Sequence, residues 1–237
     1  HFQTERRDAP IHDMRTGGEF SLDTHGFALR TAPTDVDLYD DEAVERDYHP
    51  ELEALLKAEL GATRVVVFDA TRRSSGKKGA ANKDGQRNAA RMIHVDYTPN
   101  SGPQRAKDML GEDEFDRLRA AGARMVQINV WRPTVGPVRR APLAVADAAS
   151  IPAEDLITAK QYFPDRVGEI YFLAHSDTHR WWYAPEMTTG EVLLIKGWDT
   201  ADDGRAIYCP HAAFPLPDQD DAPTRESIEV RTLAIIE

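Results

Sequence analysis

The sequence has only one cysteine, Cys209, in 237 residues. An internal disulfide is therefore excluded, and a reducing compartment such as the cytoplasm is the predicted location. The sequence also lacks any apolar run that approaches the ~20 residues of a membrane span, so we predict no membrane partner.

Positive charge is scarce as well. The chain carries 29 Lys and Arg against 40 Asp and Glu, a formal net charge of -11. Nucleic-acid-binding proteins normally show a basic stripe, so we predict no nucleic-acid partner. The dinucleotide-binding glycine fingerprint and the GxSxG motif of serine hydrolases are also missing. The length suits one β-barrel or sandwich, and we predict a single domain over residues 1–237.

Short β-like segments dominate what is present. They lie at residues 65–68, 125–133, 143–145, 170–173, 180–183, 192–196 and 228–236, and Pro, Gly and Asp separate them. This pattern predicts a mainly β core with helices attached to it.

Four other segments complete the predicted organisation. Apolar residues at helical spacing predict helices over residues 41–60 and 102–121. Residues 1–38 are polar and turn-rich, and we expect an arm packed on the core. The basic residues of 70–90 are predicted to form a mobile lid loop.

The most informative stretch is residues 91–98, which contains His94 and Asp96. On a strand, side chains two residues apart project from the same face, so this imidazole and this carboxylate can reach one point while Val95 packs behind them. An HxD tripeptide taken alone is more often a surface pair than a metal site. It needs a third ligand from elsewhere in the chain.

His211 is the best candidate for that ligand, and it is followed by Arg225 and Ser227. A guanidinium and a hydroxyl on one strand face suit the distal carboxylate of a 2-oxoacid. Two imidazoles and one carboxylate hold Fe(II) with three positions open. The order of these motifs resembles that of the Fe(II)/2-oxoglutarate oxygenases, whose core is a double-stranded β-helix, or jelly roll.

The strand predicted at residues 125–133 alternates apolar residues with Gln127, Asn129 and Trp131. In a barrel its polar face can line a cavity, where Gln127 and Asn129 would hydrogen-bond a bound acid. Solvent exposure of an edge strand explains the same alternation equally well.

Several other side chains have competing interpretations. His175 and His179 show the spacing of a zinc pair but read better as a turn, and either could replace His211 as the third iron ligand. Cys209 is predicted to be an inert packed thiol rather than a nucleophile. Lys196 is expected to reach the surface at a strand end rather than to pair with an acid such as a substrate carboxylate.

The aromatic residues Trp131, Trp181 and Tyr183 also have two interpretations. They are either core residues or, near the iron, walls of a substrate cavity.

Taken together, these motifs are similar to the hydroxylase/desaturase family of microbial natural-product pathways, of the cephamycin-cluster and aspergillic-acid-cluster type. The similar pieces are SLDTHGF at 21–27, HVD at 94–96, NVWRP at 129–133, PLA at 142–144, HRWWY at 179–183, EVLLIK at 191–196, PHAAF at 210–214 and RESIEVR at 225–231.

The resemblance implies a mononuclear non-haem iron enzyme with 2-oxoglutarate as cosubstrate. It maps the iron ligands onto His94, Asp96 and His211, and it suggests Arg225 for the distal carboxylate of the cosubstrate, with Arg231 as a rival. The long basic segment before Arg91 departs from the family pattern.

We therefore expect an oxygenase that uses O2 on a small molecule of secondary metabolism, by hydroxylation, desaturation or oxidative cyclisation. The alternative is a non-redox, metal-binding β-barrel that assists a biosynthetic partner enzyme. A homodimer is the candidate assembly.

Overall fold

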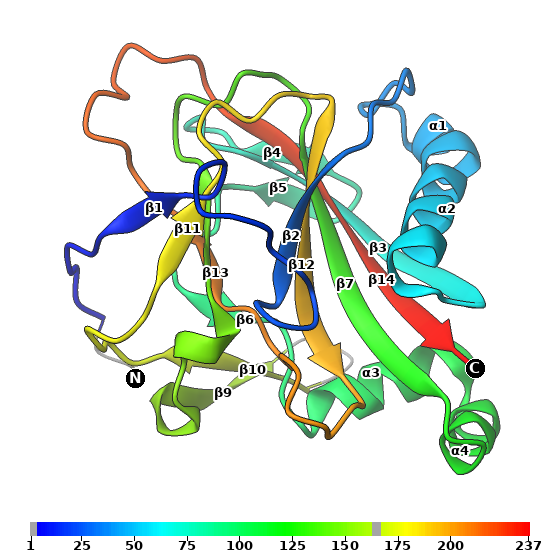
Figure 1. Cartoon of the computed structure of the whole chain (residues 1–237). Coiled ribbons are helices and arrows are strands. Elements are labelled where there is room, and N and C mark those ends of the chain that lie inside the picture. The colour runs from blue at the N-terminus through cyan, green and yellow to red at the C-terminus, as the bar shows by residue number, and fades with distance from the viewer. Residues whose placement is uncertain (1–3, 163–166) are drawn as a thin grey trace.

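Two facing β-sheets form the body of the protein, and the helical segment 41–60 packs on the outer face of one of them (Figure 1). The structure is a computed structural model, and it describes residues 4–162 and 167–237. This mainly β architecture, a double-stranded β-helix with flanking helices, confirms the predicted fold class. Within the described residues, no helix is long and apolar enough to cross a membrane.

Five of the described strands, most of them long, form the sheet that contains more residues, which we call the larger sheet although the second sheet has seven strands. Its order is β2-β12-β7-β14-β3, and every neighbouring pair is antiparallel. Because β14 lies between β7 and β3, the C-terminal strand is central rather than peripheral. The bounds are β2 Phe27–Thr31, β3 Arg64–Ser74, β7 Arg124–Pro133, β12 Glu191–Asp199 and β14 Glu226–Ile236.

The second sheet has the order β1-β11-β8-β13-β6-β10-β9, with β1 parallel to β11 and the other pairs antiparallel. The predicted strands at 143–145, 170–173 and 180–183 are confirmed here. The bounds are β1 Ile11–Asp13, β6 His94–Val95, β8 Leu143–Ala146, β9 Leu156–Tyr162, β10 Val167–Leu173, β11 Trp181–Tyr183 and β13 His211–Ala213.

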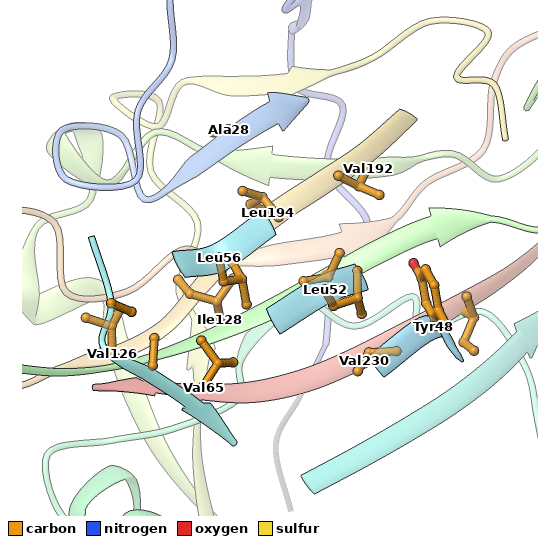
Figure 2. Packing of buried hydrophobic residues seen from close by; sticks show 14 of the residues in the cluster. Ala28, Tyr48, Leu52, Leu56, Val65, Val126, Ile128, Val192, Leu194 and Val230 are labelled. Atoms are coloured by element: carbon orange, nitrogen blue, oxygen red, sulfur yellow. The ribbon is translucent and has the colours of Figure 1, made fainter. Parts of the chain in front are cut away.

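The outer face of the larger sheet carries the main apolar core. Val126 and Ile128 of β7 pack beneath Leu52 and Leu56 of α2 (Figure 2), and Val130 belongs to the same cluster. Since side chains alternate along a strand, the intervening residues of β7 face the space between the sheets. The predicted helix over 41–60 consists of α1 Asp41–Ala43, the π-helical turn η1 Val44–Tyr48 and α2 His49–Leu60.

The helix predicted over residues 102–121 is two helices, α3 Ser101–Leu110 and α4 Glu112–Ala120. Gly111 lies between them with φ 85° and ψ 151°, a conformation that interrupts a helix and that glycine adopts without steric cost. Gly102 lets α3 approach β12, because a Cβ there would lie only 2.4 Å from the Trp198 ring.

The segments predicted as an arm and a lid take part in regular structure. Residues 11–13 and 27–31 of the arm are strands of the two sheets. The basic segment begins inside β3, which extends to Ser74, and continues as a hairpin of β4 Ala80–Asn82 and β5 Gly85–Arg87. Closure of this hairpin over the site stays a prediction. Two 3-10 turns, η2 Ala148–Ser150 and η3 Ala153–Asp155, lead into β9.

The expectation that Lys196 surfaces at a strand end is wrong. Its side chain is fully buried, and its ammonium nitrogen lies 2.9 Å from Asp23 Oδ1, 2.8 Å from Asp199 Oδ2 and 2.9 Å from the Ala206 carbonyl oxygen. All three donors are therefore used inside the protein, which does not support a role in substrate binding. Arg124 joins both aspartates, so the cluster ties the 21–27 motif to β7 and β12.

The positive charges of Arg124 and Lys196 favour the ionised form of the Asp23 carboxyl. Partial burial of Asp23 opposes ionisation, but hydrogen bonds from Arg124 and Lys196 lower the pKa of this carboxyl to about 2.

We predict that Asp199→Ala lowers the free energy of unfolding by about 3 kcal/mol or more, because it removes a fully buried partner of both Lys196 and Arg124. Lys196→Met should cost less, since Asp199 then keeps Arg124. Urea denaturation followed by circular dichroism measures both. A larger loss for Lys196→Met than for Asp199→Ala would contradict this account.

Candidate metal centre

The inner face of the larger sheet carries rows of polar residues across three strands. Arg231 on β14 pairs with Asn129 on β7 and with Asp69 on β3. Glu229, two residues before Arg231, occupies the next row. These side chains share one face because pairs directly opposite in antiparallel strands project to the same side. The polar face of β7 thus points inward, as the cavity interpretation of its alternation predicts.

His94 and His211 come from adjacent strands of the second sheet and lie directly opposite each other in the β6–β13 pairing. Their ring centroids are 4.5 Å apart. Asp96 follows β6 immediately, and one nitrogen from each imidazole and one carboxylate oxygen all lie within 4.8 Å of one another. The structure therefore brings together the three side chains that the sequence suggests as ligands.

Both imidazoles are oriented by backbone carbonyls. His94 Nδ1 lies 2.8 Å from the Met92 carbonyl oxygen, and His211 Nδ1 lies 3.0 Å from the Cys209 carbonyl oxygen. A carbonyl only accepts, so each Nδ1 carries a proton and each Nε2 is the atom left for a metal. At His94, burial opposes protonation but Asp96 raises the pKa, so a metal there displaces a proton. Burial, with the nearby His94, lowers the pKa of His211 and favours the neutral ligand form.

Asp96 uses its two oxygens differently. Oδ2 accepts from Asn129 Nδ2 at 2.7 Å and from Arg231 Nε at 3.1 Å, whereas Oδ1 lies 3.4 Å from His94 Nε2. Burial alone would raise the pKa of this carboxyl, but the Arg231 guanidinium and the His94 ring hold it well below its usual range. The carboxylate is therefore ionised before any metal binds.

Arg225, just before β14, is a buried cation with free donor capacity. Its Nη1 donates to the Ala141 carbonyl oxygen at 2.8 Å, and its guanidinium lies 5.6 Å from the centre of the Trp131 ring. Its Nε is buried without a hydrogen-bond partner among the described residues. Burial, with the positive charges of Arg73 and Arg91, lowers the pKa of Arg225 to about 10.

The remaining predicted cosubstrate residues lie on the same inner face. The Ser227 hydroxyl is buried and makes one long contact, 3.5 Å to the Arg73 carbonyl oxygen. Gln127 donates from Nε2 to the Gly102 carbonyl oxygen at 3.2 Å. Its Oε1 is buried without a partner among the described residues. Asn129 is committed to Asp96, so its position argues against direct contact with a bound acid.

Of the predicted substrate aromatics, Trp181 and Tyr183 face away from this centre. They pair with Ala146 and Ala144 on β8, whereas His211 pairs with Val145 and so projects to the opposite face. Trp181 packs in an outer apolar cluster. The substrate-cavity interpretation is therefore wrong for these two residues.

Three residues on the inner faces were not among the predicted site residues: the aromatic Trp182 and the acids Glu229 and Asp69. Trp182 pairs with Val145 and shares the face of His211, a position that the period-two alternation of β11 could have identified. Glu229 and Asp69 were missed as well; Glu229 lies between Ser227 and Arg231 at spacings of two, so the same alternation indicates that it faces inward.

The histidine pair His175 and His179 forms no part of the centre. His179 Nε2 lies 2.8 Å from Asp155 Oδ2, and His175 is exposed beside Asp177. His211 takes the third position in the cluster instead.

Comparisons with known proteins agree with the fold and the centre. A family model described as an oxidoreductase/YMDC permease-like domain matches residues 1–235. The chain is 36% identical to the hydroxylase/desaturase efuI of Hormonema carpetanum, over 96% of this chain and 83% of that protein. It is 34% identical to the Fe(II)/2-oxoglutarate-dependent dioxygenase nvfI of Aspergillus novofumigatus, over 94% of this chain and 81% of that one.

A solved structure, that of the iron and alpha-ketoglutarate-dependent endoperoxidase NvfI, superposes with a TM-score of 0.84 at 32% identity and covers 94% of this chain and 84% of that chain. The jelly roll, the His-Asp-His cluster and these relatives define an Fe(II)/2-oxoglutarate-dependent dioxygenase. The chain belongs to the oxidoreductase/YMDC permease-like domain family.

Cys209 packs beside this centre, and we predict that it is unreactive in the native protein. The thiol is fully buried, its Sγ contacts the Ala146 carbonyl oxygen at 3.6 Å, and burial raises its pKa far above that of a free cysteine. A thiol-specific chromogenic disulfide should therefore label it only after unfolding in guanidinium. Stoichiometric labelling of the folded protein within minutes would contradict this.

Proposed function

We propose that His94, Asp96 and His211 hold Fe(II), that Arg225 binds the distal carboxylate of 2-oxoglutarate, and that the enzyme oxidises a small molecule of secondary metabolism. The observation that carries the proposal is the donor set. Three ligand atoms lie within 4.8 Å of one another, and the other polar atom of each side chain is engaged elsewhere.

This donor set fits the metal. Two imidazole nitrogens and one carboxylate oxygen on one side of a cation leave three positions for cosubstrate and O2. Bound Fe(II) with 2-oxoglutarate supplies the activation of O2, with succinate and CO2 as coproducts, that makes hydroxylation, desaturation or oxidative cyclisation at an unactivated carbon feasible.

The free donors favour Arg225 over Arg231 as the cosubstrate residue. Arg231 is bound to Asp96, Asp69 and Glu229. Arg225 instead keeps a buried Nε without a protein partner among the described residues. A buried guanidinium with an unpaired N–H donor is stabilised strongly by a bound carboxylate, since the charge pair offsets the cost of desolvation.

The protein's part is to orient these groups and to exclude water. The adjacent cluster that includes Trp131, Leu193 and Ile195 closes the inner wall with apolar side chains. The positive charges of Arg73 and Arg91, which act on Arg225, favour the approach of a dianion such as 2-oxoglutarate.

We predict that Arg225→Gln weakens 2-oxoglutarate binding at least 30-fold, about 2 kcal/mol, without a comparable loss of metal affinity. Anaerobic titration of the Fe(II)-loaded protein with 2-oxoglutarate, followed by the visible charge-transfer band, measures this. Arg139→Gln is the matched control, because Arg139 is an exposed arginine paired with Glu186.

His94→Ala and His211→Ala should abolish both the charge-transfer band and the release of succinate under air. Normal band formation in either variant would overturn the assignment of the ligands. A wild-type protein that binds metal without releasing succinate would favour the non-redox, metal-binding alternative.

We also propose that two copies associate, and that the protein is cytoplasmic, as its single cysteine suggests. Among the described residues, β9 is one of the two edge strands of the second sheet, and it carries the exposed Ile157 and Tyr162. An edge strand can pair with another chain. Light scattering coupled to gel filtration should give about twice the 26.5 kDa chain mass. A mass of one chain at micromolar concentration would refute the dimer.

A further inference from the structure

A polar network behind Asp96 spans three strands of the larger sheet. Its members are Asn129 on β7, Arg231 and Glu229 on β14, and Asp69 on β3. Two donors of this network converge on a single oxygen, Asp96 Oδ2, from Asn129 at 2.7 Å and from Arg231 at 3.1 Å. The other oxygen, Oδ1, is the one that lies toward His94.

Arg231 is itself held in place by two more carboxylates. Its Nη1 lies 2.5 Å from Asp69 Oδ2, and its Nη2 lies 2.5 Å from Glu229 Oε1. The Arg231 side chain is 15% exposed and that of Glu229 is 6% exposed, so water screens this contact little. The Asp69 side chain is 37% exposed, so its contact with Arg231 is screened more. Nε and Nη1 hydrogen-bond Asp96 and Asp69, whereas Nη2 and Glu229 form an ion pair without hydrogen-bond geometry. Two charge-assisted hydrogen bonds thus set the orientation of the fork.

The backbone supports this arrangement. Asp69, Arg231 and Asn129 lie in one row across the sheet, and the β14–β3 register shifts directly after Arg231. A bulge bends a strand and re-aims the neighbouring side chains, and such bulges are frequent next to active sites.

We propose that Asn129 and Arg231 are positioning residues that make Asp96 a ligand through Oδ1 alone. This inference rests on the proposed function, in that Asp96 must bind the iron. A carboxylate that bound through both oxygens would occupy one of the three positions that cosubstrate and O2 require. Two donors on Oδ2 oppose that binding mode, because a second metal bond would have to displace them.

The charges of the network fit the same role. Asp96, Asp69 and Glu229 surround one guanidinium, which leaves two negative charges when all are ionised. A divalent cation on Oδ1 balances that charge. Without Asp69 and Glu229, the positive charge of Arg231 would repel a metal cation. With these two carboxylates beside it, Arg231 orients Asp96 while its charge is neutralised.

The test uses Co(II) as a spectroscopic probe of the metal-free protein. Asn129→Ala removes one donor to Oδ2 and leaves every charge in place, while Arg231→Lys keeps the charge but cannot reach all three carboxylates. We expect the Kd for Co(II) to rise about tenfold or more in each variant. We also expect the visible absorption of bound Co(II) to change as the carboxylate mode changes.

Two variants control for general effects on the fold. Arg30→Lys alters an arginine that binds Glu59 through two nitrogens, away from the centre, and Asn100→Ala removes an amide that donates to Glu169. Both should leave the Kd and the spectrum of bound Co(II) unchanged. Thermal melts of the metal-free variants establish that each is folded. If Arg231→Lys does not fold, Asn129→Ala alone tests the proposal.

The outcomes separate the two proposals. Wild-type protein that does not bind Co(II) would overturn the assignment of the metal centre. Wild-type protein that binds Co(II), with folded Asn129→Ala showing the same Kd and spectrum, would overturn the positioning role alone.

Discussion

The pairing of β6 with β13 is the constraint on which the rest of the centre depends. It places His94 opposite His211 although the two residues are far apart in the sequence. Each ring is then oriented by a hydrogen bond from its Nδ1 to the backbone carbonyl oxygen of the residue two positions earlier in the chain. Because both orienting acceptors are backbone atoms, the geometry of the two imidazoles follows from the strand pairing and needs no further side chain.

The larger sheet supplies the polar residues that hold Asp96. Its strands have one face in the apolar core and the other face toward the centre. One face of β7 packs beneath α2 in the apolar core, and the other carries Asn129 and Trp131 toward the second sheet. A fixed backbone thus holds both the core and the polar network. Displacement of β7 by one residue would exchange the two faces, so packing of the core also fixes the register of the centre.

Most of the buried charge near the centre and in the Lys196 cluster is paired with opposite charge. Lys196 lies between two aspartates, and Arg231 lies among three carboxylates. Arg132 and Arg225 are buried with no carboxylate partner among the described residues. Arg132 donates to the Tyr48 hydroxyl and to two backbone carbonyl oxygens, whereas Arg225 Nε has no hydrogen-bond partner there. Unpaired buried charge is costly, and such exceptions are characteristic of sites that receive a ligand. The unpartnered Nε is consistent with the proposed binding of the cosubstrate carboxylate by Arg225.

The sequence by itself determined the class of fold, most of the longer strands, and the candidate ligands His94, Asp96 and His211, because alternation and motif order are local properties of the chain. It did not indicate β9 or the short strand β13. Only the tertiary structure decided that Trp181 and Tyr183 face outward, that Lys196 is buried, and that Arg231 rather than Arg225 is saturated with carboxylates. These facts depend on which strands become neighbours. Cross-strand register joins residues that no spacing along the chain relates.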